Sequence, residues 1–222
     1  MGEENTTKRI AKNTLMLYFR QILIMIVSLY TVRVVLNTLG AEDYGIYNVV
    51  AGVVTMFSFL SNSMATASQR YFSFALGQND SESLKKYFSM SFTIYCLIAV
   101  FVLFLAETVG LWFVTQKLII PSERQTATFW IYQASIFSMI CTILTAPFMA
   151  SIIAHEDMNI YAYVSIIEVV LKLGIVFLLP LFAIDKLIFY GVLMAGVVFI
   201  NTAIYRTICV KKYVECKFSF FW

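Results

Sequence analysis

Six apolar stretches, each longer than 20 residues, take up nearly the whole chain and are separated only by short polar breaks. A helix needs about 20 apolar residues to cross the ~30 Å hydrocarbon core of a bilayer, and there it satisfies its own backbone hydrogen bonds. The sequence therefore predicts an all-α, polytopic membrane protein with six transmembrane helices. The predicted helices cover residues 14–39, 46–74, 88–114, 126–154, 160–182 and 187–210.

The composition leaves no room for a separate soluble domain. Hydrophobic residues make up 60% of the chain and charged residues 13%, whereas about 25% of the residues of an ordinary soluble domain are charged. The predicted organisation is a polar segment at 1–13, a membrane lobe at 14–210 and a polar tail at 211–222. The four cysteines and the single histidine show no disulfide or metal-ligand spacing, so neither a metal nor a cofactor is expected.

The basic residues between the stretches predict the orientation, because cytoplasmic breaks are enriched in Lys and Arg. One set of alternate breaks carries only Lys117, Arg124 and Lys186. The other set, which includes both termini, carries Lys8, Arg9, Lys12, Lys85, Lys86, Lys211, Lys212 and Lys217. We therefore expect a multi-pass plasma-membrane protein with both termini in the cytoplasm, although the break at 155–159 on that side has no Lys or Arg. The net charge of +3 reflects this bias and does not indicate nucleic-acid binding.

Polar side chains within the stretches fall into stripes when successive residues are placed ~100° apart around a helix. One arc of the stretch 46–74 contains Asn48, Thr55, Ser58, Asn62, Thr66, Gln69 and Ser73. Such residues can line a shared hydrated cavity, or they can simply join neighbouring helices at about 0.6 kcal/mol each. Seven polar positions on one face exceed what packing needs, and this favours the cavity.

Glu168 and Lys172 stand four residues apart in the middle of the stretch 160–182, in line with Tyr161 and Ser165. At a helix centre each charge costs about 2.5–3.5 kcal/mol on insertion, and a Glu four residues before a Lys can pair with it. Two interpretations stay open and do not exclude each other. The pair neutralises itself so that the membrane tolerates it, or it handles cargo or protons.

Arg20 and Arg33 each lie about six residues from an end of the first stretch, where long side chains can reach towards headgroups. Arg20 shares its face with other polar groups, whereas Arg33 lies on another face and can pair with Glu42 or Asp43. The excess of basic groups suits an anionic cargo. The predicted cavity residues are Arg20, Arg33, Asn48, Asn62, Gln69, Glu168 and Lys172.

Three segments carry a resemblance to a known family. They are TVRVVLNTLGAEDYGIY at 31–47, NVVAGVVTMFSFLSNSMATASQRYFSFALG at 48–77 and IYAYVSIIEVVLKLGIVFLL at 160–179. The chain resembles bacterial polysaccharide biosynthesis proteins of the O-antigen and capsule flippase type, within the multidrug/oligosaccharidyl-lipid/polysaccharide exporter superfamily. The break LG-x-x-x-YG-x-Y and the motif E-x-x-x-KL are the more specific parts of the match.

The resemblance implies two six-helix lobes around a central cavity that opens alternately to each side of the membrane. The implied cargo is an oligosaccharide on undecaprenyl diphosphate, moved to the periplasmic leaflet of the bacterial inner membrane without enzymatic chemistry. Basic cavity residues of the family correspond to Arg20, Arg33 and Lys172. Because this chain has six predicted helices, it resembles an amino-terminal lobe whose partners are membrane lipids and a second lobe. The coupling ion, H⁺ or Na⁺, stays open.

Three other interpretations remain. A multidrug exporter of the same superfamily would need acidic groups in the cavity, and only Glu168 lies deep in a predicted helix. An enzyme acting on polyprenyl lipids would need clustered Asp, Glu or His at the membrane surface, for which residues 155–157 are the only candidate. The chain can also be a truncated lobe with a purely structural role or none.

Overall fold

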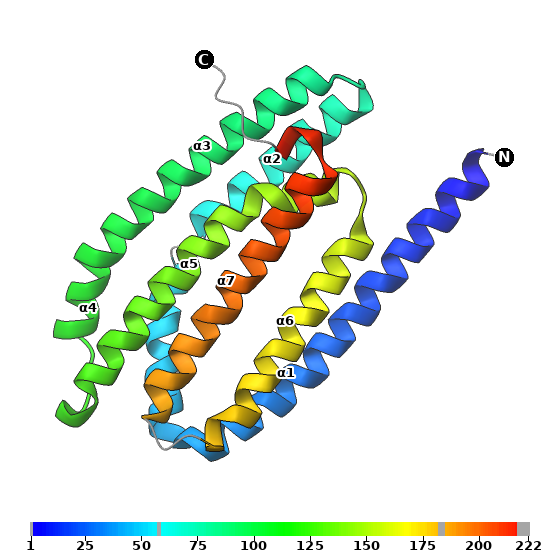
Figure 1. Ribbon diagram of the computed structural model, residues 1–222. Helices are drawn as coiled ribbons and strands as arrows, with labels where there is room; N and C mark the ends of the chain where they lie inside the picture. The colour runs from blue at the N-terminus through cyan, green and yellow to red at the C-terminus, as the bar shows by residue number, and fades with distance from the viewer. Residues whose placement is uncertain (1, 57–58, 182–184, 217–222) are drawn as a thin grey trace.

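The computed structural model describes residues 2–56, 59–181 and 185–216, with side chains for 14–56, 64–181 and 185–216. Most of these residues are helical and none of them is in a strand, which confirms the predicted all-α class (Figure 1). The long helices are α1 Gly2–Thr55, α2 Phe59–Gly77, α3 Ser81–Leu105, α5 Gln125–Ala154, α6 Met158–Leu178 and α7 Lys186–Lys212. The short ones are a π-helix Ala106–Gly110, α4 Leu111–Gln116, and the 3₁₀ turns η3 Ser122–Arg124, η4 Leu179–Leu181 and η5 Val214–Cys216.

Five segments of the described chain are long and apolar enough to cross a membrane, so this is a membrane protein. They are Thr14–Thr55, Ser81–Gln116, Ser122–Ala154, Met158–Leu181 and Lys186–Lys212. Each of the last four coincides with one predicted helix over the described residues. The first two predicted helices are arranged differently, because α1 continues past residue 39 and the predicted stretch 46–74 is shared between α1 and α2. Six separate crossings therefore remain a prediction.

A sharp bend divides α1 at Gly40, whose backbone has φ 84° and ψ 165°. This region of backbone space is essentially restricted to glycine. Gly40 therefore supplies, in a single residue, the turn that the sequence predicts as a break over 40–45. Because the chain is helical on both sides of it, the reversal between the two parts of α1 depends on this one conformation.

Replacing Gly40 with alanine is expected to lower the free energy of unfolding by about 1–3 kcal/mol, since a side chain there is strained. Unfolding by SDS titration from mixed micelles measures the change. Gly45→Ala is the matched control, because Gly45 is helical and no heavy atom lies within 4 Å of the added Cβ. Equal stability of the two variants would show that the bend does not rest on Gly40.

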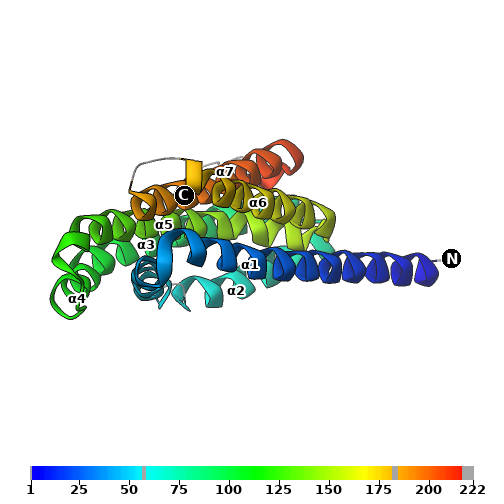
Figure 2. The same cartoon turned by 90° about the horizontal axis from the view of Figure 1, so that it is seen from below.

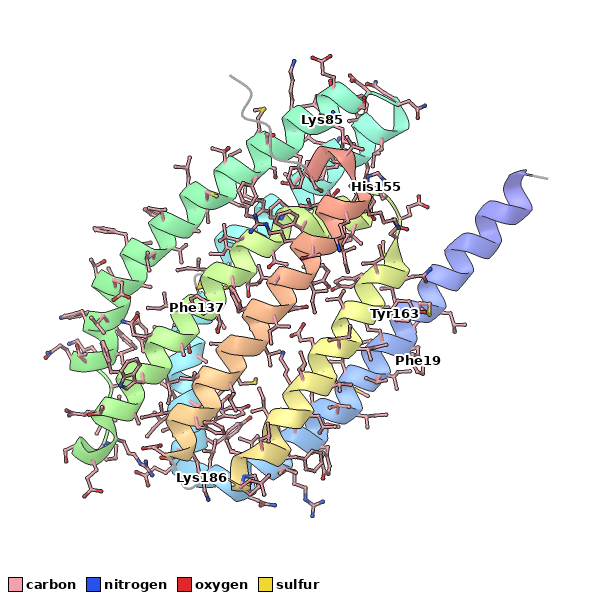
Figure 3. All side chains as sticks on the ribbon, in the orientation of Figure 1. Phe19, Lys85, Phe137, His155, Tyr163 and Lys186 are labelled. Carbon is pink, nitrogen blue, oxygen red and sulfur yellow. The ribbon has the colours of Figure 1, made fainter. Side chains whose placement is uncertain are left out.

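The helices run alternately in opposite directions, so the loops gather at two ends of the bundle (Figure 1). We call the end at which α1 begins and η5 finishes the terminal end; it also holds the turns at 78–80 and 155–157. Gly40, the connection 117–124 and Asp185 lie at the opposite end. Lys85 and His155 mark the terminal end and Lys186 the opposite one (Figure 3). Which side of a membrane the terminal end faces stays a prediction.

Helix α5 occupies the centre of the bundle. It contacts α1, α2, α3, α6 and α7, and in Figure 2 it lies between the α6–α7 pair and the α1–α2 pair. Its Tyr132 is fully buried and donates a hydrogen bond to the carbonyl of Ala106, 2.6 Å away, at the start of the π-helix. The contacts of this one helix thus fix the relative positions of the others.

The outer surface is apolar, as a lipid-facing surface requires. Helix α1 exposes large apolar side chains along much of its first half, including Leu15, Tyr18, Phe19, Ile22, Met25, Ile26 and Leu29. Helix α3 does the same with Leu97, Val100, Phe101 and Phe104 while burying Tyr95, Ala99 and Val102 against the bundle. An apolar exterior around a more polar interior is the arrangement in which the candidate site lies.

Candidate functional site

A cavity of about 340 Å³ lies between α1, α5, α6 and α7, among the membrane-spanning segments. We call it the central cavity. Its polar lining includes Arg20, Thr145, Tyr161, Ser165, Glu168, Lys172, Asn201 and Thr202. Polar and charged groups gathered inside apolar helices are expensive there and usually mark a functional site.

One face of α6 provides most of this lining. Tyr161, Ser165, Glu168 and Lys172 are spaced by four, three and four residues, which places them on one side of a helix. Arg20 reaches this face from α1. Its guanidinium carbon lies 4.5 Å from the centre of the Tyr161 ring, a cation–π contact, and its Nη1 donates to Ser165 Oγ at 3.3 Å.

The charged pair predicted on α6 is formed, and it has a third member. Lys172 Nζ lies 2.6 Å from Glu168 Oε1, and Asn201 Nδ2 of α7 donates to Glu168 Oε2 at 2.9 Å. Both carboxylate oxygens are therefore engaged. Around the same cavity, the buried Arg20 Nε and Asn201 Oδ1 have no hydrogen-bond partner among the described residues.

A hydroxyl pair joins the two helices that face α6. Thr145 Oγ1 of α5 donates to Thr202 Oγ1 of α7 at 2.8 Å, and Thr202 Oγ1 also donates to Val198 O of its own helix. This pair holds α5 to α7 beside the charged residues. It matches the interpretation of single hydroxyls as links between helices.

A second hollow of about 520 Å³ adjoins the central cavity, with which it shares Thr142, Met149, Lys172 and Val198. We call it the groove; its polar lining is Thr55, Gln69, Ser135, Ser138, Thr142 and Lys172. A third hollow at the terminal end shares Gln69 and Ile153 with the groove and includes His155. Neighbouring hollows thus share wall residues, and the three lie next to one another from the terminal end to Lys172.

The opposite end is closed by aromatic and charged contacts. Tyr47 and Tyr190 meet edge to face with ring centres 4.9 Å apart, and Tyr47 lines the groove. Beyond them, the guanidinium of Arg124 lies 3.0 Å from Asp43 and 3.1 Å from Asp185. Arg124, just before α5, thus joins the part of α1 that follows Gly40 to the residue before α7.

The predicted cavity residues separate into three groups. Arg20, Glu168 and Lys172 line the central cavity and Gln69 lines the groove. Asn48 and Arg33 are exposed and line none of the three hollows, and Asn48 donates instead to the Tyr44 carbonyl of its own helix. The side chain of Asn62 lies outside the described residues.

The structure also assigns partners that the sequence did not. Asp43 pairs with Arg124 and not with Arg33. Asn201 and Thr202 belong to the site but were not among the predicted residues. The only sequence signal for Asn201 is that it lies on one side of its helix with Tyr205, whereas its partner Glu168 comes from another helix.

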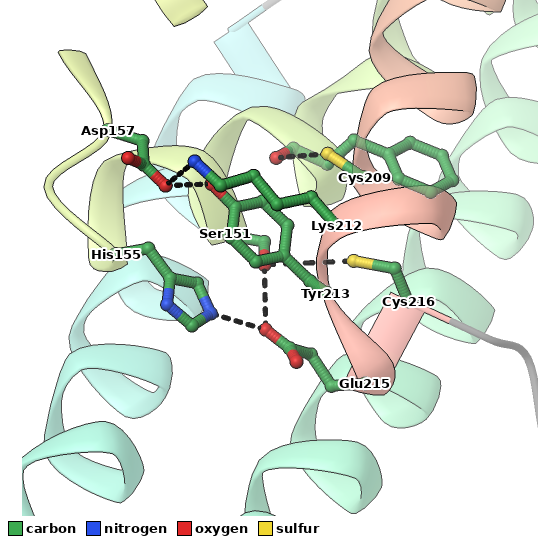
Figure 4. A network of polar contacts seen from close by, with 9 residues as sticks. Ser151, His155, Asp157, Cys209, Lys212, Tyr213, Glu215 and Cys216 are labelled. Atoms are coloured by element: carbon green, nitrogen blue, oxygen red, sulfur yellow. Dashed lines mark hydrogen bonds and ion pairs between the residues drawn. The ribbon is translucent and has the colours of Figure 1, made fainter. Parts of the chain in front are cut away.

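A second polar cluster fastens the segment after α7 to the loop between α5 and α6 (Figure 4). His155 Nε2 lies 2.6 Å from Glu215 Oε1, to which Ser151 Oγ also donates at 3.3 Å. The ring of His155 stacks on that of Tyr213 with centres 4.2 Å apart. Asp157 Oδ2 accepts hydrogen bonds from Lys212 Nζ and from the Tyr213 hydroxyl. We call these residues the terminal network.

The terminal network has the geometry of a structural joint. Ser151 Oγ and His155 Nε2 contact the same oxygen of Glu215, so one side chain after α7 joins both the end of α5 and the loop that follows it. Among the described residues no group of three His, Cys, Asp or Glu side chains is placed to hold a metal ion. The polar groups at 155–157 therefore hold the end of α7 in place.

Acidification is expected to weaken this joint. Burial by itself would raise the pKa of Glu215, but the His155 hydrogen bond and charge and the Ser151 hydrogen bond hold it below its ordinary 4.5. Likewise, Lys212 and Tyr213 outweigh burial and lower the pKa of Asp157. A depressed carboxyl pKa stabilises the fold above the unfolded pKa, and that stabilisation is lost as pH falls through the folded pKa.

The measurement compares wild type with Glu215→Gln by SDS titration at several pH values. The variant should be about 1–2 kcal/mol less stable near pH 6. The gap should shrink as pH falls from about 4.5, the ordinary pKa, through the lower pKa of Glu215 in the folded protein, where wild type loses the charge as well. A gap that widened on acidification would contradict this account of the joint.

Comparison with known proteins adds no family. Neither protein-family models, curated protein sequences nor solved structures give a match to this chain. The fold and the site therefore define a class and no more: an α-helical membrane protein with a charged cavity among its spanning helices.

Proposed function

We propose that this chain is the amino-terminal lobe of a flippase-type transporter, in which the central cavity receives an anionic, lipid-linked cargo. The observation that carries the proposal is the placement of Arg20 and Lys172 on one cavity inside membrane-spanning helices. Following the resemblance, the cargo is an oligosaccharide on undecaprenyl diphosphate, moved from the cytoplasmic to the periplasmic leaflet of a bacterial plasma membrane for surface polysaccharide synthesis.

The physical task fits the cavity. A diphosphate with several sugars does not cross ~30 Å of hydrocarbon unaided, since unpaired polar and charged groups are heavily penalised there. Fixed cations and hydroxyls, such as Arg20, Lys172 and Ser165, lower that barrier without covalent chemistry. The polyprenyl tail is apolar and stays in the lipid throughout.

The positions of the three hollows favour loading of the cargo from the terminal end. The hollows lie next to one another from the terminal end to Lys172, whereas Tyr47–Tyr190 and Arg124 close the opposite end. The basic residues of the sequence favour a cytoplasmic terminal end. We therefore propose that this arrangement corresponds to the state of the cycle that is open to the cytoplasm.

A second lobe is the partner that the groove calls for. Thr55 and Thr142 are exposed polar residues within spanning segments, and both line the groove. Each hydroxyl donates to a carbonyl of its own helix, so the need for a cover comes from the number of polar side chains that gather on this one face of spanning helices. We propose that six further helices, on this chain's continuation or on another chain, cover this face and enclose water.

A cation-coupled multidrug exporter of the same superfamily is the alternative, favoured by the single acidic side chain of the cavity. Glu168 would bind the organic cation or the coupling ion. Its two oxygens are occupied by Lys172 and Asn201, so a cation would first have to displace an ammonium group. An anionic cargo can bind Arg20 without first displacing another charged group.

Codon changes in the native gene test the proposal in cells, where any partner lobe is present. Arg20→Ala and Lys172→Ala should each abolish surface polysaccharide at unchanged protein level, because each removes a cation from the cavity. Arg206→Ala is the matched control, since Arg206 is exposed and lines none of the three hollows. Normal polysaccharide in both cavity variants would contradict the proposal, and sensitivity to organic cations without a polysaccharide defect would favour the exporter.

A further inference from the structure

We propose that Glu168 is a built-in anion that occupies Lys172 until the cargo displaces it, so that Arg20 binds an incoming phosphate first and Lys172 second. This inference rests on the proposed function, because it concerns how the same cavity recognises its anion. It follows from an asymmetry between the two cations: one is neutralised by the protein and the other is not.

Lys172 is neutralised by contacts from two helices. Its Nζ lies 2.6 Å from Glu168 Oε1, and Asn201 of α7 holds the other carboxylate oxygen at 2.9 Å. If the pair served only to make two charges tolerable in the membrane, the contact between Glu168 and Lys172 within α6 would suffice. The bond from Asn201 fixes the carboxylate in its orientation towards Lys172, as a positioning residue does.

The pair faces open space. The side chains of Lys172 and Glu168 are 34% and 27% exposed, and both line the central cavity, while Lys172 also lines the groove. A ligand entering through the groove thus meets Lys172. Because an anion and a carboxylate compete for the same ammonium group, the carboxylate lowers the affinity of the site for any anion.

Arg20 lies in the same cavity without a carboxylate within ion-pair distance among the described residues. Its contacts are with the Tyr161 ring and the Ser165 hydroxyl, and its buried Nε has no partner there. These contacts orient the guanidinium and include no ion pair among the described residues. A phosphate oxygen would add to this set without displacing any charge.

The spacing of the two cations indicates the class of ligand. Arg20 contacts Ser165, and Lys172 lies seven residues further along α6, about 10 Å at 1.5 Å per residue. Two flexible side chains can converge across that distance on a group with several negative oxygens. A diphosphate, either free or as the headgroup of a polyprenyl lipid, has the required charges on adjacent phosphorus atoms.

The test measures binding of farnesyl diphosphate to the full chain in nanodiscs. Glu168→Gln keeps the shape of the side chain and removes its charge, so it should tighten binding about tenfold or more. Glu168→Gln/Lys172→Met should lose that gain, because the freed ammonium group is gone. Arg20→Met should weaken binding in both the wild-type and the Glu168→Gln background.

Glu107→Gln is the matched control. Glu107 is a half-buried glutamate that accepts a hydrogen bond from Gln133 at 3.3 Å and lies outside the three hollows. Its neutralisation should leave the affinity for farnesyl diphosphate unchanged. Glu168→Ala provides a second neutral variant in case the glutamine variant does not fold, and it should show the same gain.

The outcomes separate this inference from the function on which it rests. Failure of wild type and of both neutral variants to bind would overturn the anion-transport proposal together with the inference. Binding by wild type, with no gain in either neutral variant, would overturn the inference alone. Competition by inorganic pyrophosphate would show that the diphosphate group alone suffices for binding. If the Glu168 variants bind only the farnesyl form more tightly, the ligand enters from the bilayer. Both outcomes support displacement of Glu168.

Discussion

Replacing Lys172 with methionine should lower the free energy of unfolding by about 2 kcal/mol, because it leaves the carboxylate of Glu168 unpaired among membrane-spanning helices. Breaking a fully buried pair costs about 3–5 kcal/mol. We expect less because the side chain of Glu168 is 27% exposed to the cavity, where water screens it. Unfolding by SDS titration from mixed micelles measures the loss.

The double variant Glu168→Gln/Lys172→Met decides whether the unpaired charge is the cause. It removes both charges and keeps the hydrogen bond that Asn201 can donate to the side-chain oxygen at position 168. We expect it to regain most of the stability lost in Lys172→Met. A double variant no more stable than the single one would show that packing of the Lys172 stem, and not the charge of Glu168, matters.

Replacing Arg124 with glutamine should cost about 2 kcal/mol, since Arg124 is the one described cation paired with both Asp43 and Asp185. The side chains of Arg124 and Asp185 are 37% and 35% exposed, so water screens the second pair. Asp43 is the larger contributor because it is only 7% exposed. The loss should also loosen the closed end of the bundle, where α1, η3 and the start of α7 meet. The same SDS titration measures the loss of stability.

Lys186→Gln is the matched control for Arg124, because Lys186 is an exposed cation at the same end of the bundle. An exposed substitution of this kind usually changes stability by less than about 0.5 kcal/mol. The variant Asp43→Asn/Arg124→Gln should recover part of the loss. Equal effects of Arg124→Gln and Lys186→Gln would mean that the ion pairs contribute nothing.

The helices from α3 onwards could be predicted because each coincides with an apolar stretch bounded by polar residues. The region around residue 40 could not. The predicted polar break at 40–45 remains helical from Ala41 onwards, and the backbone reverses at Gly40 alone. Hydropathy records polarity, whereas this turn is a matter of one residue's φ and ψ.

The site was predictable only where its partners are close in sequence. The pairing of Glu168 with Lys172 follows from a spacing of four residues, but the bond from Asn201 joins residues 33 apart. Asn48 was predicted on one stripe with Gln69, but the two residues lie on different helices, α1 and α2, so a single helical phase does not relate them. Arg33 was included for its charge, although the sequence placed it on another face than Arg20, and it is exposed. The His155–Glu215 contact, 60 residues apart, left no pattern in the sequence.

Water in the groove is what the transport proposal requires at Thr142, which is exposed and lines both the groove and the central cavity. Thr142→Cys, in a Cys96→Ser background, should react with a membrane-impermeant anionic methanethiosulfonate at least about tenfold faster than Leu97→Cys, because the thiolate forms in water and not in lipid. Leu97 is 66% exposed on the apolar outer face of α3. Equal, slow reaction at both positions would show that the interior is dry and contradict the proposed transport role.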